Sequence, residues 1–403
     1  MSFDEIAGRM EPGSRILIIG ASVRAAAQSA VNAGLRPICA DLFGDEDLRQ
    51  IAECQAIDEY PHQFVDWAVR QAQQFGRLPL MYTGGLENYP DTIQRLGELH
   101  TLMGNSASVL RRVRDPFWIE RSLAEAALPS ASNIRHDAEA NGRNEGSTDC
   151  GKWLVKPLAG SAGFGIRVSE ANQPIDAEHY RQQYYDGPTI AAVFVADGER
   201  CRLVGTTMQL VGLQSLAAGP FGWCGSFGPI PLRKQTVDTI QRIGDCLVQQ
   251  SGLEGVFGVD CVLANDTVIP LEVNPRYTGS CEVHERAGIW QLFDRVDLAA
   301  DAEFTNADRP RQFIGKAIVF ARQSVVADNL IQFEFVADRP ANGEVIQQHN
   351  PVCTVFGQGD RVETCLIDLA SRIEQVSQHL FGKHVGFHQE VRRLWERYLP
   401  FIE

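Results

Sequence analysis

The first hundred residues alternate short apolar runs with helical stretches. A continuous apolar run over residues 15–20 ends in glycine, as a buried strand of a parallel sheet does. The alanine-rich stretch 22–33 has helical character, and further strands are expected over 36–41 and 78–82. Strand, helix and strand in this order predict a doubly wound α/β domain. The first turn, 20–25, lacks the second and third glycines of the dinucleotide fingerprint, which argues against NAD.

The hydrophobic pattern changes after this region. Residues 105–130 are expected to be helical, with a helix start at Asp115-Pro116. From residue 152 to 211 strand-like runs alternate with turns, and 236–251 has apolar residues at helical spacing. Mixed α/β and α+β architecture is therefore expected. The remaining segments are a polar loop predicted over 133–151, a third region that begins at 316–322 and includes the run 351–356, and a helix predicted over about 360–380.

Length and composition limit the classes of protein. A chain of 403 residues exceeds one ordinary domain, so two to three domains are expected. The net charge of −14 argues against a general nucleic-acid binder, which presents a basic surface. The ten cysteines include no Cys-x-x-Cys pair, and several lie in apolar runs, which fits a reducing cytoplasm. The N-terminus lacks the segments of a signal peptide, and no apolar run reaches membrane-spanning length, so no membrane partner is expected.

Four polar residues in the second half of the chain form the most informative pattern. An apolar run ends at Asp260, and the next run carries Glu272, Asn274 and Arg276 at alternate positions. Asn265-Asp266 supplies a hairpin turn between the runs. Alternate residues of a strand share a face, so these side chains are expected to converge on one small volume. Two carboxylates and an amide oxygen suit Mg²⁺ held together with substrate phosphates, and a solvated polar strand face is the alternative.

A glycine-rich segment lies upstream of this acidic pattern. A short apolar strand over 153–157 carries Lys156 and leads into Gly160-Ser-Ala-Gly163-Phe-Gly165. The order differs from a P-loop, in which the lysine follows the glycines. Glycine and serine let backbone N–H groups approach phosphate oxygens, and Lys156 adds a mobile cation. Alone, the segment is equally consistent with an ordinary hairpin tip, but together with the acidic strands it predicts a phosphate and metal site.

The segments 156–165, Gly258-Val-Asp260 and Leu271-Glu-Val-Asn-Pro-Arg276 resemble the motifs of the ATP-grasp superfamily, in its carboxylate–amine ligase type. The C-terminal segments 337–343 and 351–356 resemble the small β subdomain of biotin-carboxylase-like members. The resemblance covers nearly the whole chain. Within the superfamily, the chain looks closest to carboligase-like proteins of one-carbon cofactor gene neighbourhoods.

This resemblance implies the ATP-grasp fold, in three parts. A Rossmann-like pre-ATP-grasp domain is expected over residues 1–105. The ATP-grasp domain, with ATP between its two lobes, is expected over 106–310, and a C-terminal α+β subdomain over 311–403. Dimers are frequent in the superfamily, so the resemblance implies a homodimer.

The resemblance also implies a set of ATP contacts from two segments. The glycine-rich loop covers the phosphates, and its lysine contacts them. The segment 182–187 matches the linker strand of the family, which supplies adenine contacts. Its two tyrosines are equally consistent with core aromatics. The implied ATP-binding residues are Lys156, Ser161, Gly163, Gly165, Gln183, Tyr184 and Tyr185.

The metal site follows from the same resemblance. Asp260, Glu272 and Asn274 are implied to hold one or two Mg²⁺ ions, with Mn²⁺ as the alternative metal. Arg276 and Lys156 are the implied catalytic residues, and Arg276 faces the γ-phosphate or the acyl phosphate.

One position departs from the family pattern. Many members carry an Asp-Lys pair at the start of the linker helix, and its lysine helps to hold ATP. The corresponding position here reads Asp115-Pro116, so that lysine is missing. Lys152 and Arg111 are the candidate substitutes.

The reaction that the resemblance implies is ATP-dependent ligation. A carboxylate attacks the γ-phosphate to give an acyl phosphate and ADP, and an amine then displaces phosphate to form an amide. Positioning and charge neutralisation supply most of the catalysis. The chain is expected to join an amino acid to another small molecule in cofactor biosynthesis, with tetrahydromethanopterin- or methanofuran-type metabolism as the candidate pathway. An ATP-grasp carboxylase that uses carboxyphosphate and a catalytically silent nucleotide-binding regulator are the alternatives.

The carboxylate substrate is expected between the ATP site and the first domain. Arg24 is a candidate to grip that carboxylate, with a solvated helix start as the alternative, and Glu87 lies in the turn after a strand. His284 is the histidine expected nearest to the substrate, although a structural role is as consistent. The glycine- and aromatic-rich segment 221–228 is either a cover for the substrate or irregular packing.

Overall fold

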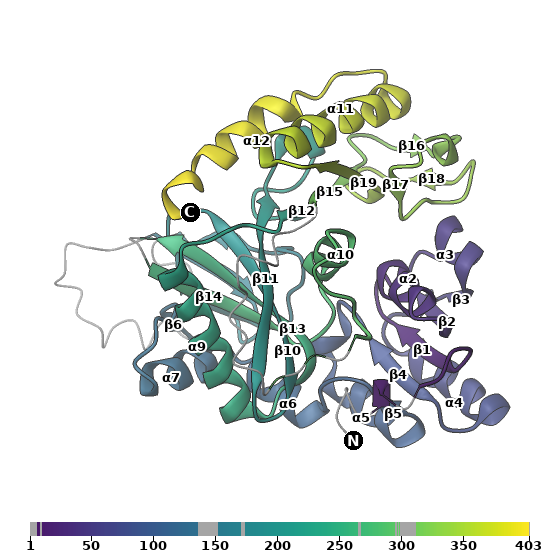
Figure 1. Ribbon diagram of the computed structural model, residues 1–403, viewed down its shortest axis with the longest axis horizontal. Helices are drawn as coiled ribbons and strands as arrows, with labels where there is room; N and C mark the ends of the chain where they lie inside the picture. The colour runs from purple at the N-terminus through teal and green to yellow at the C-terminus, as the bar shows by residue number, and fades with distance from the viewer. Residues whose placement is uncertain are drawn as a thin grey trace.

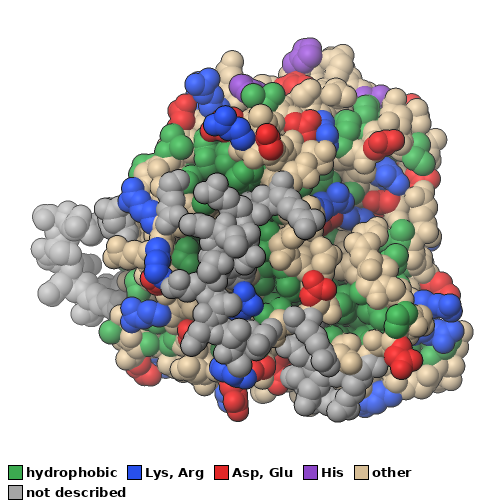
Figure 2. Space-filling model, viewed as in Figure 1, with side chains coloured by type: hydrophobic (Ala, Val, Ile, Leu, Met, Phe, Trp, Pro, Cys, Tyr) green, Lys and Arg blue, Asp and Glu red, His purple; other side chains and the backbone are tan. Residues whose placement is uncertain are grey.

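The computed structural model describes residues 6–8, 10–135, 152–170, 174–264, 267–294, 296, 298 and 312–402. In Figure 1 an N-terminal sheet lies to one side and a large sheet occupies the centre, with α11 (Val362–Phe381) and α12 (Phe387–Glu396) beside the C-terminal strands of the large sheet. Acidic and basic side chains are interspersed over the face drawn in Figure 2, without one large basic field. No helix within the described ranges is long and apolar enough to cross a membrane.

The N-terminal sheet has five parallel strands in the order β3-β2-β1-β4-β5. This confirms the predicted doubly wound domain, whose strand order reverses beside β1. The turns after β1 and β4 therefore lie at the carboxyl edge where such sheets bind ligands. The elements are β1 (Arg15–Ile19), α2 (Arg24–Asn32), β2 (Arg36–Asp41), α3 (Glu46–Ile51), β3 (Glu53–Ala56), α4 (Gln63–Phe75), β4 (Pro79–Tyr82), η1 (Leu86–Asn88), α5 (Pro90–Leu99) and β5 (Thr101–Leu102).

The segment predicted to be helical over 105–130 forms two helices, and the second begins at the predicted start. Helix α6 (Ala107–Val113) ends before Asp115, and α7 (Pro116–Glu125) begins directly after it. The Asp115 carboxylate accepts a hydrogen bond from the backbone N–H of Phe117 at 2.9 Å, so it caps α7 as the Asp-Pro signal predicts.

The central sheet has eight strands in the order β14-β13-β10-β11-β12-β15-β19-β17. Neighbouring strands are antiparallel, and the C-terminal strands continue the same sheet. The expected domain boundaries at 105 and 310 stay predictions. The elements are β10 (Thr189–Asp197), β11 (Cys201–Val211), η2 (Gln214–Leu216), β12 (Trp223–Gly228), α9 (Lys234–Ser251), β13 (Glu254–Ala264), β14 (Thr267–Asn274), α10 (Gly279–Arg286), β15 (Phe313–Phe320), η4 (Leu330–Gln332), β17 (Val336–Ala337), β19 (Pro351–Gly359), α11 (Val362–Phe381), α12 (Phe387–Glu396) and η5 (Leu399–Phe401).

The two faces of the central sheet have different neighbours. Ala192 and Phe194 of β10 belong to the apolar core that includes residues of α9. Val193 and Val195, on the opposite face, belong to a second core with Ala27 of α2. Because alternate strand residues point to opposite faces, the N-terminal sheet and α10 lie on the second face, where the cleft opens.

Two small sheets complete the described fold. One has the order β6-β9-β7-β8, and the other pairs β16 with β18. The predicted Asn265-Asp266 turn and most of the loop predicted over 133–151 lie outside the described residues. The elements are β6 (Asn133–Ile134), β7 (Trp153–Pro157), β8 (Arg167–Val168), β9 (His179–Gln183), β16 (Val325–Val326) and β18 (Val345–Ile346).

Candidate active site

The acidic residues come together on β13 and β14. Asp260 lies directly opposite Glu272 in the antiparallel pair, and Gly258 lies opposite Asn274. Opposed residues share a face, so the two carboxylates are adjacent. The Asn274 side-chain amide donates to Oδ2 of Asp260 at 3.0 Å. All three polar side chains line the cleft of ≈600 Å³, as the alternation in the sequence predicted.

The two carboxylates have opposite tendencies to hold a proton. Burial raises the pKa of Asp260 to about 8, and the neighbouring Glu272 adds to this shift. Burial also favours the neutral form of Glu272, but Lys156 and Arg114 outweigh it and lower the pKa of Glu272. Asp260 thus holds its proton more tightly than Glu272, and a divalent cation bound to both would replace that proton. Two adjacent carboxylates with an amide beside them fit the expected Mg²⁺.

Arg276 is fixed by residues on both sides of the cleft. Its Nε donates to Oε1 of Glu87 at 2.9 Å, and its Nη2 donates to Oδ1 of Asn274 at 3.4 Å. Glu87 is on η1, in the turn that follows β4, and its side chain is fully buried. The N-terminal domain therefore positions the arginine of the central site. Glu87 does not line the cleft, so it positions Arg276 and is not a substrate contact.

Lys156 lies on β7 at the cleft. Its ammonium donates to Oε1 of Gln182 at 3.1 Å, on the neighbouring strand β9. Burial lowers its pKa, but Tyr180 and Glu272 outweigh burial, so the net shift is upward. The buried lysine thus keeps a positive charge beside the acidic pair.

The glycine-rich loop packs against the start of β12. Gly163 has a φ of +77°, and a Cβ there would lie 1.9 Å from the carbonyl oxygen of Phe221. The backbone N–H of Trp223 donates to the carbonyl of Ala162 at 3.0 Å. Only glycine fits at position 163. The segment 221–228 is neither a free cover nor irregular: residues 223–228 form a strand, and Phe221 and Trp223 line the cleft.

The three expected adenine contacts follow β9 at one end of the cleft. Gln183, Tyr184 and Tyr185 are half-buried and line the cleft, so the two tyrosines are not core aromatics. The Tyr185 hydroxyl donates to Oε1 of Gln183 at 3.1 Å. Lys152 lies over the Tyr184 ring, 4.6 Å from its centroid. Lys152 therefore lies beside the expected adenine contacts.

Arg114 is the cation that the sequence reasoning missed. Its Nη2 donates to the carbonyl of Gly160 at 2.9 Å and to the Asn88 side chain at 3.0 Å. Its Nη1 donates to the carbonyl of Val273 at 3.0 Å. Arg114 thus connects the glycine-rich loop, the metal strand and the N-terminal domain. The other candidate, Arg111, pairs instead with exposed Asp91. The only signal in the sequence was the position of Arg114, next to the Asp-Pro pair.

Replacing Arg114 by glutamine is expected to raise the KM for ATP about tenfold, since three hydrogen bonds from a charged donor are lost and the loop is less well held. Steady-state kinetics with varied ATP measures this. The matched control is Arg111→Gln, in the last turn of α6 just before Arg114, which is expected to leave the KM unchanged. An Arg114→Gln protein with the wild-type KM would contradict this role.

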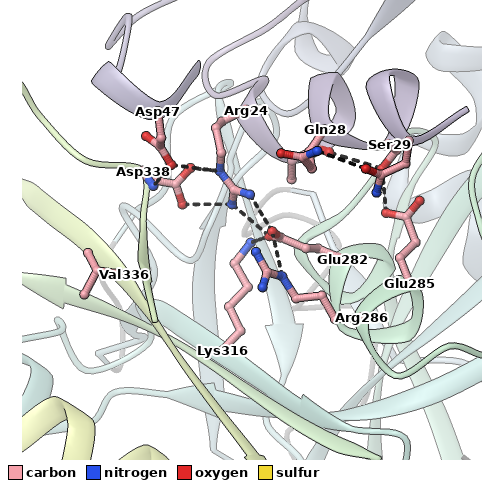
Figure 3. A network of polar contacts seen from close by, with 12 residues as sticks. Arg24, Gln28, Ser29, Asp47, Glu282, Glu285, Arg286, Lys316, Val336 and Asp338 are labelled. Carbon is pink, nitrogen blue, oxygen red and sulfur yellow. Dashed lines mark hydrogen bonds and ion pairs between the residues drawn. The ribbon is translucent and has the colours of Figure 1, made fainter. Parts of the chain in front are cut away.

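Arg24 is buried at the start of α2, so the alternative of a solvated helix start is wrong. Its Nη1 donates to Glu282 at 2.6 Å, and its Nε donates to Asp338 at 2.9 Å. Figure 3 shows this arginine between the two carboxylates, with Lys316 and Arg286 also directed at Glu282. Arg24 therefore grips carboxylates of the protein, and it joins the N-terminal domain to α10 and to the segment after β17.

His284 does not reach the cleft. Its side chain is fully buried on α10, and a Cβ on Gly205 would lie 2.7 Å from its ring. Burial lowers its pKa to about 4, so the ring is neutral. The expectation that His284 contacts substrate is therefore wrong, because the face of α10 that carries it packs on the central sheet.

Acidic side chains gather where α3 meets the segment after β17. Burial raises the pKa of Asp45 to about 8, and Asp338, Asp41 and Asp47 add to this shift. The backbone N–H groups of Asp338 and Arg339 donate to the Asp47 carboxylate at 3.0 and 2.9 Å. The C-terminal segment is thus held against α3 by hydrogen bonds within an acidic region.

We expect Asp45→Asn to raise the melting temperature at pH 8 by a few degrees and to change it little at pH 4. Unfolded Asp45 ionises near pH 4, whereas folded Asp45 keeps its proton to about pH 8. The folded chain therefore binds the extra proton in this window, and wild-type stability falls as the pH rises. Thermal unfolding at both pH values measures the effect, with exposed Asp58→Asn as the control. Equal gains at both pH values would contradict it.

The parallel N-terminal sheet, the glycine-rich hairpin with its lysine and the acidic strand pair are the parts expected of an ATP-grasp fold. Residues 121–280 match the family model described as ATP-grasp domain. This part of the chain, from α7 to α10, is similar to ATP-grasp domains. The chain is 19% identical over 367 residues to an uncharacterized protein of Methanocaldococcus jannaschii. The alignment covers 85% of this chain and 88% of that protein.

Solved structures share the fold over nearly the whole chain. The biotin carboxylase domain of the Hydrogenobacter thermophilus 2-oxoglutarate carboxylase, in complex with MgADP, ADP and bicarbonate, matches with a TM-score of 0.71. The match covers 96% of this chain and 99% of that one at 13% identity. An L-amino acid ligase from Bacillus licheniformis matches with a TM-score of 0.65, 15% identity and coverage of 90% and 98%. At these identities the likeness shows the ATP-grasp fold.

Proposed function

We propose that this chain is an ATP-dependent carboxylate–amine ligase that forms an amide through an acyl phosphate. The observation that carries the proposal is the single cleft in which the Asp260–Glu272 pair, Lys156 and Arg276 meet. Carboxylates for a divalent cation and cations for phosphate oxygens are the groups that phosphoryl transfer needs. ATP and Mg²⁺, with Mn²⁺ as the alternative, are the proposed cofactors.

Each residue of the cleft has a role in this proposal. Lys156 binds phosphate oxygens, and the backbone of the glycine-rich loop covers them. Gln183, Tyr184 and Tyr185 bind the adenine. Asp260, Glu272 and Asn274 hold Mg²⁺, which neutralises the phosphate charge when bound. Arg276, held by Glu87, orients the γ-phosphate and then the acyl phosphate.

The proposed substrates are small molecules, one with a carboxylate and one with an amine. An amino acid is the proposed partner, and the L-amino acid ligase is a protein of the same fold. We place the reaction in cytoplasmic cofactor biosynthesis, with tetrahydromethanopterin- or methanofuran-type one-carbon metabolism as the proposed pathway and a homodimer as the proposed assembly. These finer assignments rest on the family resemblance.

A carboxylase that uses carboxyphosphate is the second candidate. The biotin carboxylase domain, crystallised with bicarbonate, shares this fold with a TM-score of 0.71. The intact acidic pair argues against a third candidate, a silent nucleotide-binding regulator, because such a protein has no need for metal ligands.

A phosphate-release assay tests the three candidates together. The full chain, ATP and Mg²⁺ are incubated with panels of carboxylates and amines, and separately with bicarbonate. We expect release only when a carboxylate and an amine are both present, with the amide detected by mass spectrometry. Release with bicarbonate and no amine would favour the carboxylase. ATP binding without turnover in any mixture would overturn the ligase and favour the regulator.

A further inference from the structure

The cleft continues from Arg276 toward the C-terminal strands of the central sheet. Gln209 of β11, Lys316 of β15 and Thr354 of β19 line this part of the cleft. Gln209 is paired with Ser226 of β12, and Ser226 is paired with Lys316. Residues that oppose each other on neighbouring strands share a face, and the strands are ~4.8 Å apart. Gln209, Ser226 and Lys316 therefore form one polar row on the cleft face of the sheet.

The polar side chains of this part of the cleft are buried but incompletely bonded. Gln209, Lys316 and Thr354 are 9%, 6% and 2% exposed. Among the residues that the structure describes, neither the Gln209 amide nor the Thr354 hydroxyl has a side-chain hydrogen-bond partner. Both side chains line the cleft, where water or a bound polar group can pair with their polar atoms. A bound polar group in the cleft would supply the missing partners.

Ion pairs within the protein already engage most of the charged side chains in this part of the cleft. The Asp338 oxygens accept from Arg24 at 2.9 and 3.4 Å, and Arg24 also donates twice to Glu282. Arg24 and Asp338, which both line the cleft, are thus already paired with other side chains of the protein (Figure 3). The Lys316 ammonium donates to Glu282 at 2.7 Å, and an ammonium has three N–H donors, so it can donate to a ligand as well.

Glu282 also fixes the position of the Lys316 ammonium. Glu282 is buried on α10 and accepts from Arg24, Lys316 and Arg286, so three cations surround one carboxylate. Burial raises the pKa of Glu282, but Arg24 and Lys316 outweigh it and hold that pKa well below its usual range. Asp47 and Asp338 balance the remaining charge around Arg24. Because the positive and negative charges around Lys316 balance, hydrogen bonds from Lys316, and not a net electrostatic attraction, would select the ligand.

We propose that Lys316, Gln209 and Thr354 bind the carboxylate of an amino acid whose amine attacks the acyl phosphate. The ammonium donates to that carboxylate, and the amide and hydroxyl complete its hydrogen bonds. This assignment rests on the proposed ligase function. The amine forms the new C–N bond with the acyl carbon, the acyl–phosphate bond breaks, phosphate leaves with the electron pair, and the amine proton passes to solvent.

The experiment compares each α-amino acid with the amine that lacks its carboxylate, using the full chain with ATP and Mg²⁺. For the wild type, we expect kcat/KM to be at least about tenfold higher for the amino acid. Lys316→Met is expected to raise the KM for the amino acid about tenfold or more and to abolish this preference, with the KM for ATP unchanged. Thr354→Val, a nearly isosteric change, is expected to raise the same KM by a smaller factor. Lys234→Met, at an exposed lysine of α9, is the control.

Two controls separate binding from folding. Lys316→Arg keeps the charge and is expected to retain the preference for amino acids, and circular dichroism checks that each variant is folded. A wild-type enzyme that uses both kinds of amine equally, or a folded Lys316→Met protein with an unchanged KM for the amino acid, would overturn the assignment.

A failure of the proposed function gives a different result. If no pair of substrates yields an amide, calorimetric titration of the MgADP-loaded chain with the same amino acids tests the site alone. Binding by the wild type that Lys316→Met loses would keep the carboxylate site while the ligase function falls. Absence of binding by the wild type would overturn both.

Discussion

Replacing Glu272 by glutamine is expected to lower kcat about 10³-fold or more while the affinity for ATP falls by less than about tenfold. Glu272 is the carboxylate of the pair that is ionised, because Lys156 and Arg114 lower its pKa. Glutamine keeps the size of the side chain but removes the negative charge that the metal needs. ATP would keep its contacts with the loop and with the adenine end, whereas the transition state would lose its metal.

Two measurements separate these effects. Phosphate release at saturating ATP gives kcat, and equilibrium binding of a fluorescent ATP analogue gives the affinity. Titration with Mg²⁺ is expected to need a much higher concentration in Glu272→Gln than in the wild type. Glu344→Gln, at an exposed glutamate near β18, is the matched control. Activity within tenfold of the wild type would show that Glu272 is not a metal ligand.

The acidic site was predictable because it depends on a local rule. Side chains two apart on a strand share a face, and this rule alone brings Glu272 and Asn274 together. Asp260 joins them because the two strands are adjacent in the sequence and pair as a hairpin. Continuous apolar runs identified β1 and β2 for the same reason, since the signal is confined to a few neighbouring residues.

The residues that the sequence did not reveal depend on distant pairing. Lys316 joins Gln209 and Ser226 only through the order β11-β12-β15, in which β15 lies almost ninety residues after β12 along the chain. Arg24 meets Glu282 across a separation of 258 residues. A single sequence shows the periodicity of each segment but not the order of strands from distant segments. The prediction for Arg24 therefore gave its tendency to bind a carboxylate, but not Glu282 and Asp338 as the carboxylates that it binds.

Orientation around a helix explains two further differences. His284 and Glu282 lie two residues apart on α10, so they point in different directions. Glu282 contacts Arg24 and Lys316 at the cleft, whereas His284 packs beneath the helix against Gly205. Proximity to the metal motif in the sequence did not distinguish these faces. Arg114 was missed because its three acceptors include two backbone carbonyls, which no side-chain pattern indicates.

Replacing Arg276 by lysine is expected to lower kcat about 10²-fold or more with a smaller change in the KM for ATP. Lysine keeps the charge but lacks the planar fork of guanidinium donors. The arginine reaches Glu87, Asn274 and the carbonyl of Tyr277 at once, and a single ammonium cannot hold all three. Single-turnover phosphate transfer, measured separately from ATP binding, tests this result. Equal losses in ATP affinity and in turnover would assign Arg276 to nucleotide binding alone.

Glu87 provides a second test of the same arrangement, because it touches Arg276 without lining the cleft. Glu87→Gln is expected to lower kcat about tenfold, since the arginine loses its buried counter-charge but stays present. If Glu87 acts only through Arg276, the double variant Glu87→Gln/Arg276→Lys should be no slower than Arg276→Lys alone. Purely additive losses in kcat would mean that Glu87 has a separate role. Thermal unfolding of each variant distinguishes lost positioning from lost stability, because breaking a buried ion pair also destabilises the fold.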